Sequence, residues 1–196
     1  MKLKEFKKAM KKSVFRTAEA QLIGFKSSSS LVNLQLYQWK LSGDLIQLKR
    51  GVYAFSEAKL DSKDIARALY EPCYFSLEYV LNLHNIMPEV VFAHTLVTTK
   101  ATRKFTTPLG DFYFRKIKKE AFLGFDPDSL VANKEKALVD YFYLNSAKLI
   151  PNRKFWTEMR FYTEELNFKK IFQYASAFKS KKLIYLLNNF KSYAKA

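Results

Sequence analysis

Residues 44–55 have the sequence DLIQLKRGVYAF, and this stretch decides how the N-terminal region is interpreted. Two short β-prone runs flank Lys49, Arg50 and Gly51, and this arrangement predicts a β-hairpin with a basic tip. The fold that contains the hairpin then depends on the residues before and after it.

Two helical patterns lie near the N-terminus. Apolar residues recur at helical spacing over residues 3–12 and again over residues 16–23. Gly24 is expected to end the second helix.

A third helical pattern runs directly into the hairpin. Val32, Leu36 and Trp39 follow one another at i, i+4 and i+7, which predicts one buried stripe. The serines at 27–30 are therefore interpreted as a helix N-cap region, although a flexible serine linker has the same composition. Gly43 is expected to end this helix. Three helices followed by a basic hairpin predict a winged helix-turn-helix over residues 1–56.

Residues 57–196 predict a second domain of mixed composition. Strand patterns cover residues 90–99, 103–107 and 111–117, with a turn at 108–110. Helical patterns cover residues 62–70, 76–85, 133–145, 168–177 and 182–193. We therefore expect an α+β protein in which a mixed C-terminal domain carries a small antiparallel sheet and several helices.

The charge of the chain is strongly positive and unevenly distributed. Its 196 residues include 34 Lys and Arg against 18 Asp and Glu, a net charge of +16. Residues 1–55 hold 11 of these basic residues and 3 of the acidic ones, and the last thirty residues hold seven lysines and no acid. Such a balance favours nucleic acid, an anionic membrane surface or an acidic partner, while a lysine-rich proteome would also produce it.

Several classes of protein are disfavoured by the sequence. The single cysteine, Cys73, permits no intramolecular disulfide, which is typical of a reducing compartment. The basic N-terminus lacks the apolar segment of a signal peptide, and no apolar run reaches the about 20 residues that span a bilayer. We expect a cytoplasmic protein that uses no cofactor and does not bind membranes.

The winged-helix interpretation predicts a DNA-binding site. The recognition helix of such a module enters the major groove and meets base edges, while the basic hairpin tip meets phosphates or the minor groove. Winged helices also mediate protein contacts, so the fold alone does not establish DNA binding. The residues expected to contact DNA are Ser29, Ser30, Asn33, Tyr37, Lys40, Lys49 and Arg50.

Catalytic signals are weak, and no catalytic or metal-binding residue is predicted. His84 and His94 have no spaced partners for a metal site, and the five glycines form no phosphate-binding loop. Cys73 is interpreted as buried packing. Glu135 and Asp140 are five residues apart and do not share a helix face well, which argues against a carboxylate pair. A nuclease, the alternative from the enzyme class, would need such a cluster.

Nearly the whole chain resembles the AbiEi-type antitoxins of type IV toxin–antitoxin systems, also described as phage abortive-infection proteins. The order and spacing of several segments carry this resemblance. They are residues 45–53, 65–66, 73–81, 84–89, 97–99, 105–110, 113–114 and 135–140.

The resemblance implies two activities. The N-terminal winged helix would bind inverted repeats in its own promoter as double-stranded DNA and repress the operon, with two protomers able to bind cooperatively. The C-terminal domain would neutralise a nucleotidyltransferase-like toxin without a stable direct complex. The alternative is a winged-helix transcriptional regulator with no toxin partner, and the neighbouring gene discriminates between the two.

Overall fold

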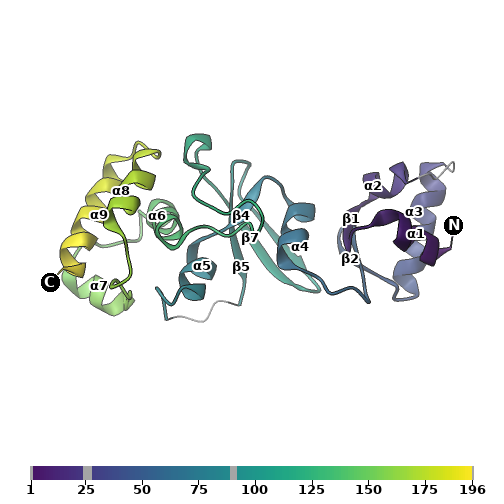
Figure 1. Ribbon diagram of the computed structural model, residues 1–196, viewed down its shortest axis with the longest axis horizontal. Coiled ribbons are helices and arrows are strands. Elements are labelled where there is room, and N and C mark those ends of the chain that lie inside the picture. The colour runs from purple at the N-terminus through teal and green to yellow at the C-terminus, as the bar shows by residue number, and fades with distance from the viewer. Residues whose placement is uncertain (1, 24–27, 89–91, 196) are drawn as a thin grey trace. The chain divides into compact units, whose positions relative to one another are not determined.

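The computed structural model describes residues 2–23, 28–88 and 92–195, which form two compact units (Figure 1). Unit 1 consists of residues 1–71 and 105–110, and unit 2 consists of residues 72–104 and 111–196. Unit 1 therefore extends beyond residue 56, where the sequence analysis placed a domain boundary, because a further helix and a distant turn make their contacts with it. Gly24, Ser27 and residues 90–91 of an expected strand lie outside the described residues.

Unit 1 contains helices and a three-stranded antiparallel sheet with the strand order β1-β3-β2. Strands β2 and β3 form the hairpin expected from the sequence, with a β-bulge between Gln47 and Lys49. Strand β1 was not predicted, because its three residues are too few to show an alternating pattern. The elements are α1 (Leu3–Met10), β1 (Val14–Arg16), α2 (Thr17–Leu22), α3 (Ser29–Leu41), β2 (Leu45–Lys49), β3 (Val52–Phe55) and α4 (Ser62–Leu69).

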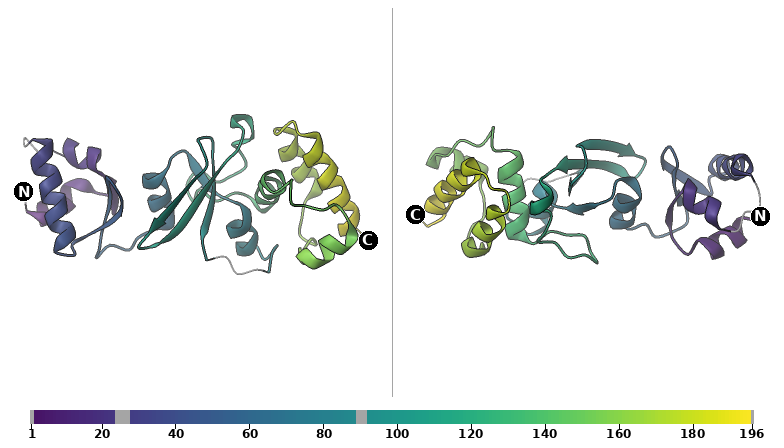
Figure 2. Two further views of the ribbon diagram at one scale, coloured as in Figure 1. Left: turned by 180° about the vertical axis from the view of Figure 1, so that it is seen from behind. Right: turned by 90° about the horizontal axis from the view of Figure 1, so that it is seen from above.

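A single aromatic-rich core joins the first three helices of unit 1 to its sheet. Figure 2 shows these helices gathered on one side of the sheet. The Phe6 ring lies 5.0 Å from the Trp39 ring and 5.3 Å from the Phe15 ring, measured between centroids. The predicted stripe of α3 is buried here, which confirms that Val32, Leu36 and Trp39 point inward. Burying such large side chains supplies most of the stabilisation of a small unit.

Unit 2 contains helices and most of a four-stranded sheet; residues 105–107 and Gly110 of that sheet belong to unit 1. Strand β4, the short 3-10 helix η1 and helix α7 were not predicted, whereas the remaining elements fall within a few residues of their predicted bounds. They are β4 (Cys73–Phe75), α5 (Leu77–Leu83), β5 (His94–Thr98), β6 (Arg103–Thr107), β7 (Gly110–Lys116), the 3-10 helix η1 (Lys119–Ala121), α6 (Lys134–Leu144), α7 (Arg153–Met159), α8 (Phe168–Ser176) and α9 (Lys181–Ala194).

The sheet of unit 2 is mixed, so the prediction of an antiparallel sheet was wrong. Its strand order is β4-β5-β7-β6; β4 and β5 pair antiparallel, whereas β5 and β7 pair parallel. The chain passes from β5 to the outer strand β6 and returns through the turn at 108–109 as β7, between the two. Because β7 returns beside β5, the two strands run in the same direction. The alternation of residues along the sequence does not show which strand of the β6–β7 hairpin lies next to β5, so the parallel pairing could not be predicted.

Helix α6 is the central helix of unit 2. It contacts α5 as well as α8 and α9, and it is buried along most of its length. Phe142 of α6 stacks on Trp156 of α7, with 5.4 Å between ring centroids, and also contacts Phe190 of α9. This packing explains why α6 has little amphipathic character: neighbours cover it on several sides.

Candidate nucleic-acid interface

Helix α3 presents most of its predicted contact residues to solvent. Its N-cap position is Ser28, whose carbonyl oxygen accepts hydrogen bonds from the amides of Leu31 at 3.0 Å and Val32 at 3.3 Å. After the helix ends, Gly43 adopts a φ of +81°, as expected for a glycine that follows a helix C-terminus. Both ends of α3 are thus fixed by local backbone geometry.

The polar side chains predicted to contact DNA lie on the exposed part of α3. Ser29, Ser30, Asn33, Tyr37 and Lys40 are all exposed. Within the described part of the chain, the side chains of Ser30 and Asn33 make no hydrogen bond to protein, so their donors and acceptors are available. The Lys40 ammonium group donates to Gln47 Oε1 at 2.9 Å, which places this side chain toward β2.

The outward face of α3 also carries large apolar side chains, which sequence reasoning overlooked. Leu34, Tyr37 and Leu41 lie opposite the buried stripe, since each residue turns an α-helix by about 100°. Leu31 lies beside them, and all four side chains are more than half exposed. The helix therefore has apolar residues on both faces, and this is the signal in the sequence that could have revealed the outer ones.

Arg50 lies in the turn of the β2–β3 hairpin and is exposed. The neighbouring Gly51 has a φ of +78°, and its carbonyl oxygen accepts a hydrogen bond from the Thr17 amide at 2.9 Å. This bond joins the hairpin turn to the first residue of α2. The guanidinium group of Arg50 is thus attached to a turn that is held by backbone geometry.

Lys49, predicted to extend from the hairpin tip toward DNA, points toward α4 instead. It is half-buried, its ammonium group donates to the carbonyl oxygen of Leu69 at 2.5 Å, and it lies 4.5 Å from the centre of the Phe105 ring. Arg16 donates to the carbonyl oxygens of Arg67 at 2.7 Å and Ala68 at 3.1 Å. Two cations from the sheet therefore bind the last carbonyl groups of α4, where a helix favours positive charge. A DNA contact by Lys49 stays a prediction.

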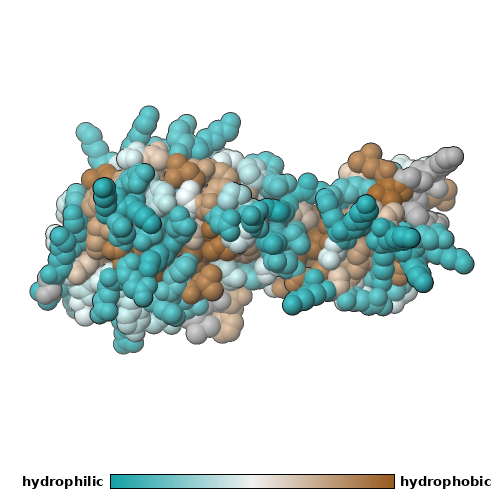
Figure 3. All heavy atoms as spheres, viewed as in Figure 1, coloured by the Kyte–Doolittle hydropathy of each residue, from teal (hydrophilic) through white to brown (hydrophobic). Residues whose placement is uncertain are grey.

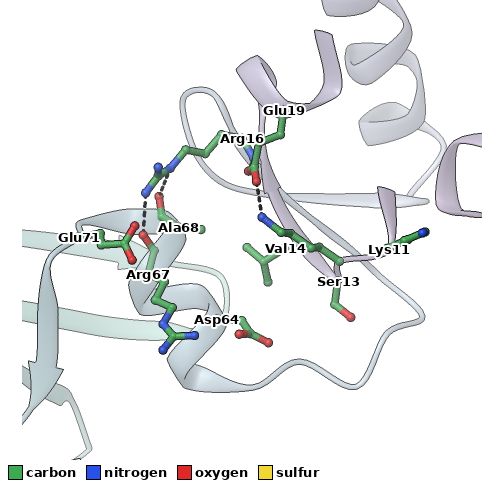
Figure 4. Close-up of a pocket in the computed structure, with 10 residues that line it drawn as sticks. Lys11, Ser13, Val14, Arg16, Glu19, Asp64, Arg67, Ala68 and Glu71 are labelled. Carbon is green, nitrogen blue, oxygen red and sulfur yellow. Dashed lines mark hydrogen bonds and ion pairs between the residues drawn. The ribbon is translucent and has the colours of Figure 1, made fainter. Parts of the chain in front are cut away.

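A polar hollow of about 380 Å³ lies beside this contact, between α4 and the β1–α2 segment (Figure 4). Its lining mixes basic and acidic side chains: Lys11, Lys12, Arg16 and Arg67 with Glu19, Asp64 and Glu71. Glu19 already accepts hydrogen bonds from Lys12 Nζ at 2.6 Å and from the Arg16 amide at 2.8 Å. The lining thus carries charges of both signs, which does not favour one class of charged ligand.

Unit 2 contains a buried polar cluster, which we define as Tyr74, Ser76, Lys136 and Asp140. None of these four side chains is exposed to solvent. Lys136 forms an ion pair with Asp140 and donates to Tyr74 Oη at 2.8 Å. Asp140 Oδ2 accepts from Tyr74 Oη at 2.9 Å and from Ser76 Oγ at 2.8 Å. Every charged group of the cluster is thus paired and hydrogen-bonded, as stable burial requires.

Packing seals the buried polar cluster. The Tyr74 ring stacks on Phe125 at 4.5 Å, and Lys136 Nζ lies 5.0 Å from the centre of the Phe178 ring. Gly124, with a φ of +78°, backs the lysine so closely that a Cβ atom there would lie 3.0 Å from Lys136 Cγ. Burial lowers the pKa of Lys136 and raises the pKa of Asp140, while their mutual attraction opposes both shifts. The cluster joins β4 to α6, and its four side chains are fully buried.

The remaining candidate residues lie in unit 2 and differ in their surroundings. Cys73 is buried in β4, which confirms the packing interpretation. His84 is exposed at the C-terminal end of α5, and the half-buried His94 lies in β5 with its ring 4.6 Å from that of Phe112. Burial lowers the pKa of His94. The Glu135 carboxylate accepts from the Asn167 amide at 3.4 Å, so it is engaged separately from Asp140.

The described residues contain neither a cluster of metal-ligating side chains nor a helix that could span a membrane. Within residues 2–23, 28–88 and 92–195, no three His, Cys, Asp or Glu side chains are placed to hold a metal ion together. Across the same residues, no helix combines the length and the apolar character needed to cross a bilayer.

Comparison with known proteins identifies a similar fold. The chain matches no protein-family model and no curated protein. The crystal structure of the Rv2827c protein from Mycobacterium tuberculosis is similar, with a TM-score of 0.51 over 94% of this chain and 77% of that chain, at 12% sequence identity. At this identity the likeness concerns the fold alone. The fold and the comparison together define the class as a mixed α+β protein.

Proposed function

We propose that unit 1 is a winged helix-turn-helix that binds double-stranded DNA, and that the protein represses its own operon. The order α1-β1-α2-α3-β2-β3, with the sheet order β1-β3-β2, is compatible with this class of module. In helix-turn-helix proteins the second helix of the pair lies in the major groove. Helix α3 follows α2 and contacts it, so α3 is the recognition helix in this proposal. Residues 1–71 hold fourteen Lys and Arg against seven Asp and Glu, which favours a polyanionic partner.

One observation carries the proposal: α3 exposes hydrogen-bonding side chains that no described residue of the protein engages. Ser30 and Asn33 lie in the first two turns of the helix, the part that meets base edges in this class. An asparagine amide can bind the N6 and N7 atoms of adenine with two hydrogen bonds. Arg50 is exposed at the hairpin turn, and this exposure supports a contact with a phosphate.

Replacement of Asn33 tests this proposal. We expect Asn33→Ala to weaken binding to the DNA upstream of the gene by about 1–3 kcal/mol while leaving binding to unrelated duplexes nearly unchanged. Asn188→Ala, which removes an exposed asparagine side chain in unit 2, is the matched control and should change neither affinity. Fluorescence anisotropy with labelled duplexes measures the affinities for the upstream DNA and for unrelated DNA. If Asn33→Ala binds the upstream DNA as tightly as the unchanged protein does, Asn33 does not contact a base.

We further propose that the protein is the antitoxin of a type IV toxin–antitoxin pair and opposes a nucleotidyltransferase-like toxin without a stable direct complex. The resemblance of the sequence segments to AbiEi-type antitoxins supports this proposal. Co-expression with the product of the adjacent gene, scored by growth, tests it. Growth arrest by that product alone and rescue by this protein are the expected results. DNA binding without rescue would leave a transcriptional regulator that has no toxin partner.

A further inference from the structure

The outward face of α3 is unusual because its centre is apolar. Leu34, Tyr37 and Leu41 follow one another at i, i+3 and i+7, and their side chains are 52%, 53% and 67% exposed. Single exposed leucines are common on protein surfaces, but a line of them on one helix marks a contact site. Figure 3 shows apolar side chains on the surface in the region of α2 and α3, with hydrophilic ones beside them.

We call Leu34, Tyr37 and Leu41 the leucine line. The residues around the leucine line favour DNA as its partner. Asn33 and Ser30 are exposed next to Leu34, and the unit that carries them has twice as many basic as acidic residues in its first 71 positions. A protein partner would gain from the leucines but would not need this excess of positive charge. A duplex offers phosphates to the cations together with one strongly apolar group in the major groove, the C5-methyl group of thymine.

We infer that α3 recognises A·T base pairs through thymine methyl groups, with Leu34 and Leu41 packed against the methyl groups and Asn33 bonded to adenine. This inference rests on the proposed DNA-binding function and specifies its substrate. Leu34 and Leu41 are seven residues apart, about 10 Å along the helix. This distance is too great for both side chains to contact the methyl group of one thymine. The two leucines therefore reach thymines on separate base pairs.

The test removes the methyl groups and nothing else. A short duplex is first selected by the protein from a random-sequence pool, and a second duplex is made in which every thymine is replaced by uracil. Removing one methyl group that becomes buried is expected to lower affinity about fourfold, so two such contacts give about fifteenfold. Anisotropy titrations of both duplexes measure the ratio of affinities.

Two variants show which side chains are responsible. In Leu34→Asn/Leu41→Asn the thymine-to-uracil ratio is expected to fall to near one. Leu83→Asn makes the same chemical change at a leucine that is 58% exposed in unit 2, and it should keep the ratio of the unchanged protein. Because all three positions are exposed, circular dichroism should show folded variants.

The possible outcomes separate the inference from the function on which it rests. A thymine-to-uracil ratio near one for the unchanged protein, with DNA still bound, overturns methyl recognition and leaves the DNA-binding proposal standing. Failure to bind any duplex at low salt overturns both. If the α3 variant binds both duplexes like the unchanged protein but loses self-association in sedimentation, the leucine line is a protein interface and the inference is wrong.

Discussion

The exposed face of α3 and the buried polar cluster of unit 2 use similar side chains in opposite ways. On α3, Ser30 and Asn33 face solvent and make no hydrogen bond to described residues. In the cluster, Ser76, Lys136 and Asp140 are fully buried and bonded to one another. Polar residues with unused hydrogen-bonding capacity can recognise a partner, whereas satisfied buried ones fix the packing of the fold.

The largest effect is expected where the buried polar cluster loses its carboxylate. Asp140→Ala leaves the Lys136 ammonium group buried without its counter-charge and should lower the free energy of unfolding by about 3–5 kcal/mol. Asp128→Ala, an exposed carboxylate in the same unit, should change it by less than about 0.5 kcal/mol. Urea denaturation followed by circular dichroism measures both. If Asp140→Ala is folded and fully stable but fails to rescue growth, the cluster is required for function and not for packing.

Salt should affect the two regions very differently. If four to six phosphates are contacted, raising the salt concentration from about 50 to about 200 mM should weaken DNA binding by about a hundred- to a thousandfold. The Lys136–Asp140 pair is screened much less because it is buried, so the unfolding free energy of unit 2 should change little. Anisotropy and urea titrations at both salt concentrations check this. Unchanged DNA affinity would contradict the electrostatic argument.

The two basic residues of the hairpin are expected to have different roles, Arg50 in DNA binding and Lys49 in the stability of unit 1. Arg50→Ala should make the plot of log binding constant against log salt concentration less steep, by about one unit of slope. Lys49→Ala removes a charged hydrogen bond to the end of α4 and should instead cost unit 1 about 1–2 kcal/mol of stability. The double variant should weaken operator binding and leave toxin neutralisation intact. Equal loss of both activities would argue against separable units.

A smaller effect is expected at Glu19. Burial raises its pKa, but hydrogen bonds from Lys12 and the Arg16 amide outweigh burial, so the pKa of this carboxyl group lies below its ordinary value of 4.5. A depressed carboxyl pKa stabilises the fold above the unfolded value, and this contribution is lost as the pH falls below 4.5 through the folded value. The contribution should be below about 1 kcal/mol. Thermal melts of Glu19→Gln should show a weaker pH dependence over this range.

The sequence was most informative where patterns are local. The buried stripe Val32, Leu36 and Trp39 and the hairpin around Gly51 follow from periodicity and turn chemistry, and both are confirmed. The strand β1 and the parallel pairing of β5 with β7 were missed, because they depend on contacts between distant residues. Local spacing carries no information about which strands become neighbours.

The candidate site shows the same limit. Exposure of the polar residues of α3 could be predicted, since they lie away from the apolar stripe. The position of Lys49 could not, because its partners Leu69 and Phe105 come from later parts of the chain. The Lys136–Asp140 pair has the i, i+4 spacing of helical ion pairs, and this local signal could have predicted it.

Unit 1 is not one continuous piece of chain, because residues 105–110 belong to it. Phe105 lies against Lys49 and also contacts Tyr70, with 5.8 Å between the two ring centroids. A fragment that stops after residue 71 keeps the α3 face and the hairpin but lacks this aromatic ring. Anyone who isolates the N-terminal region for binding or crystallisation should therefore expect a loosened α4, and should supply the missing segment or keep the full chain.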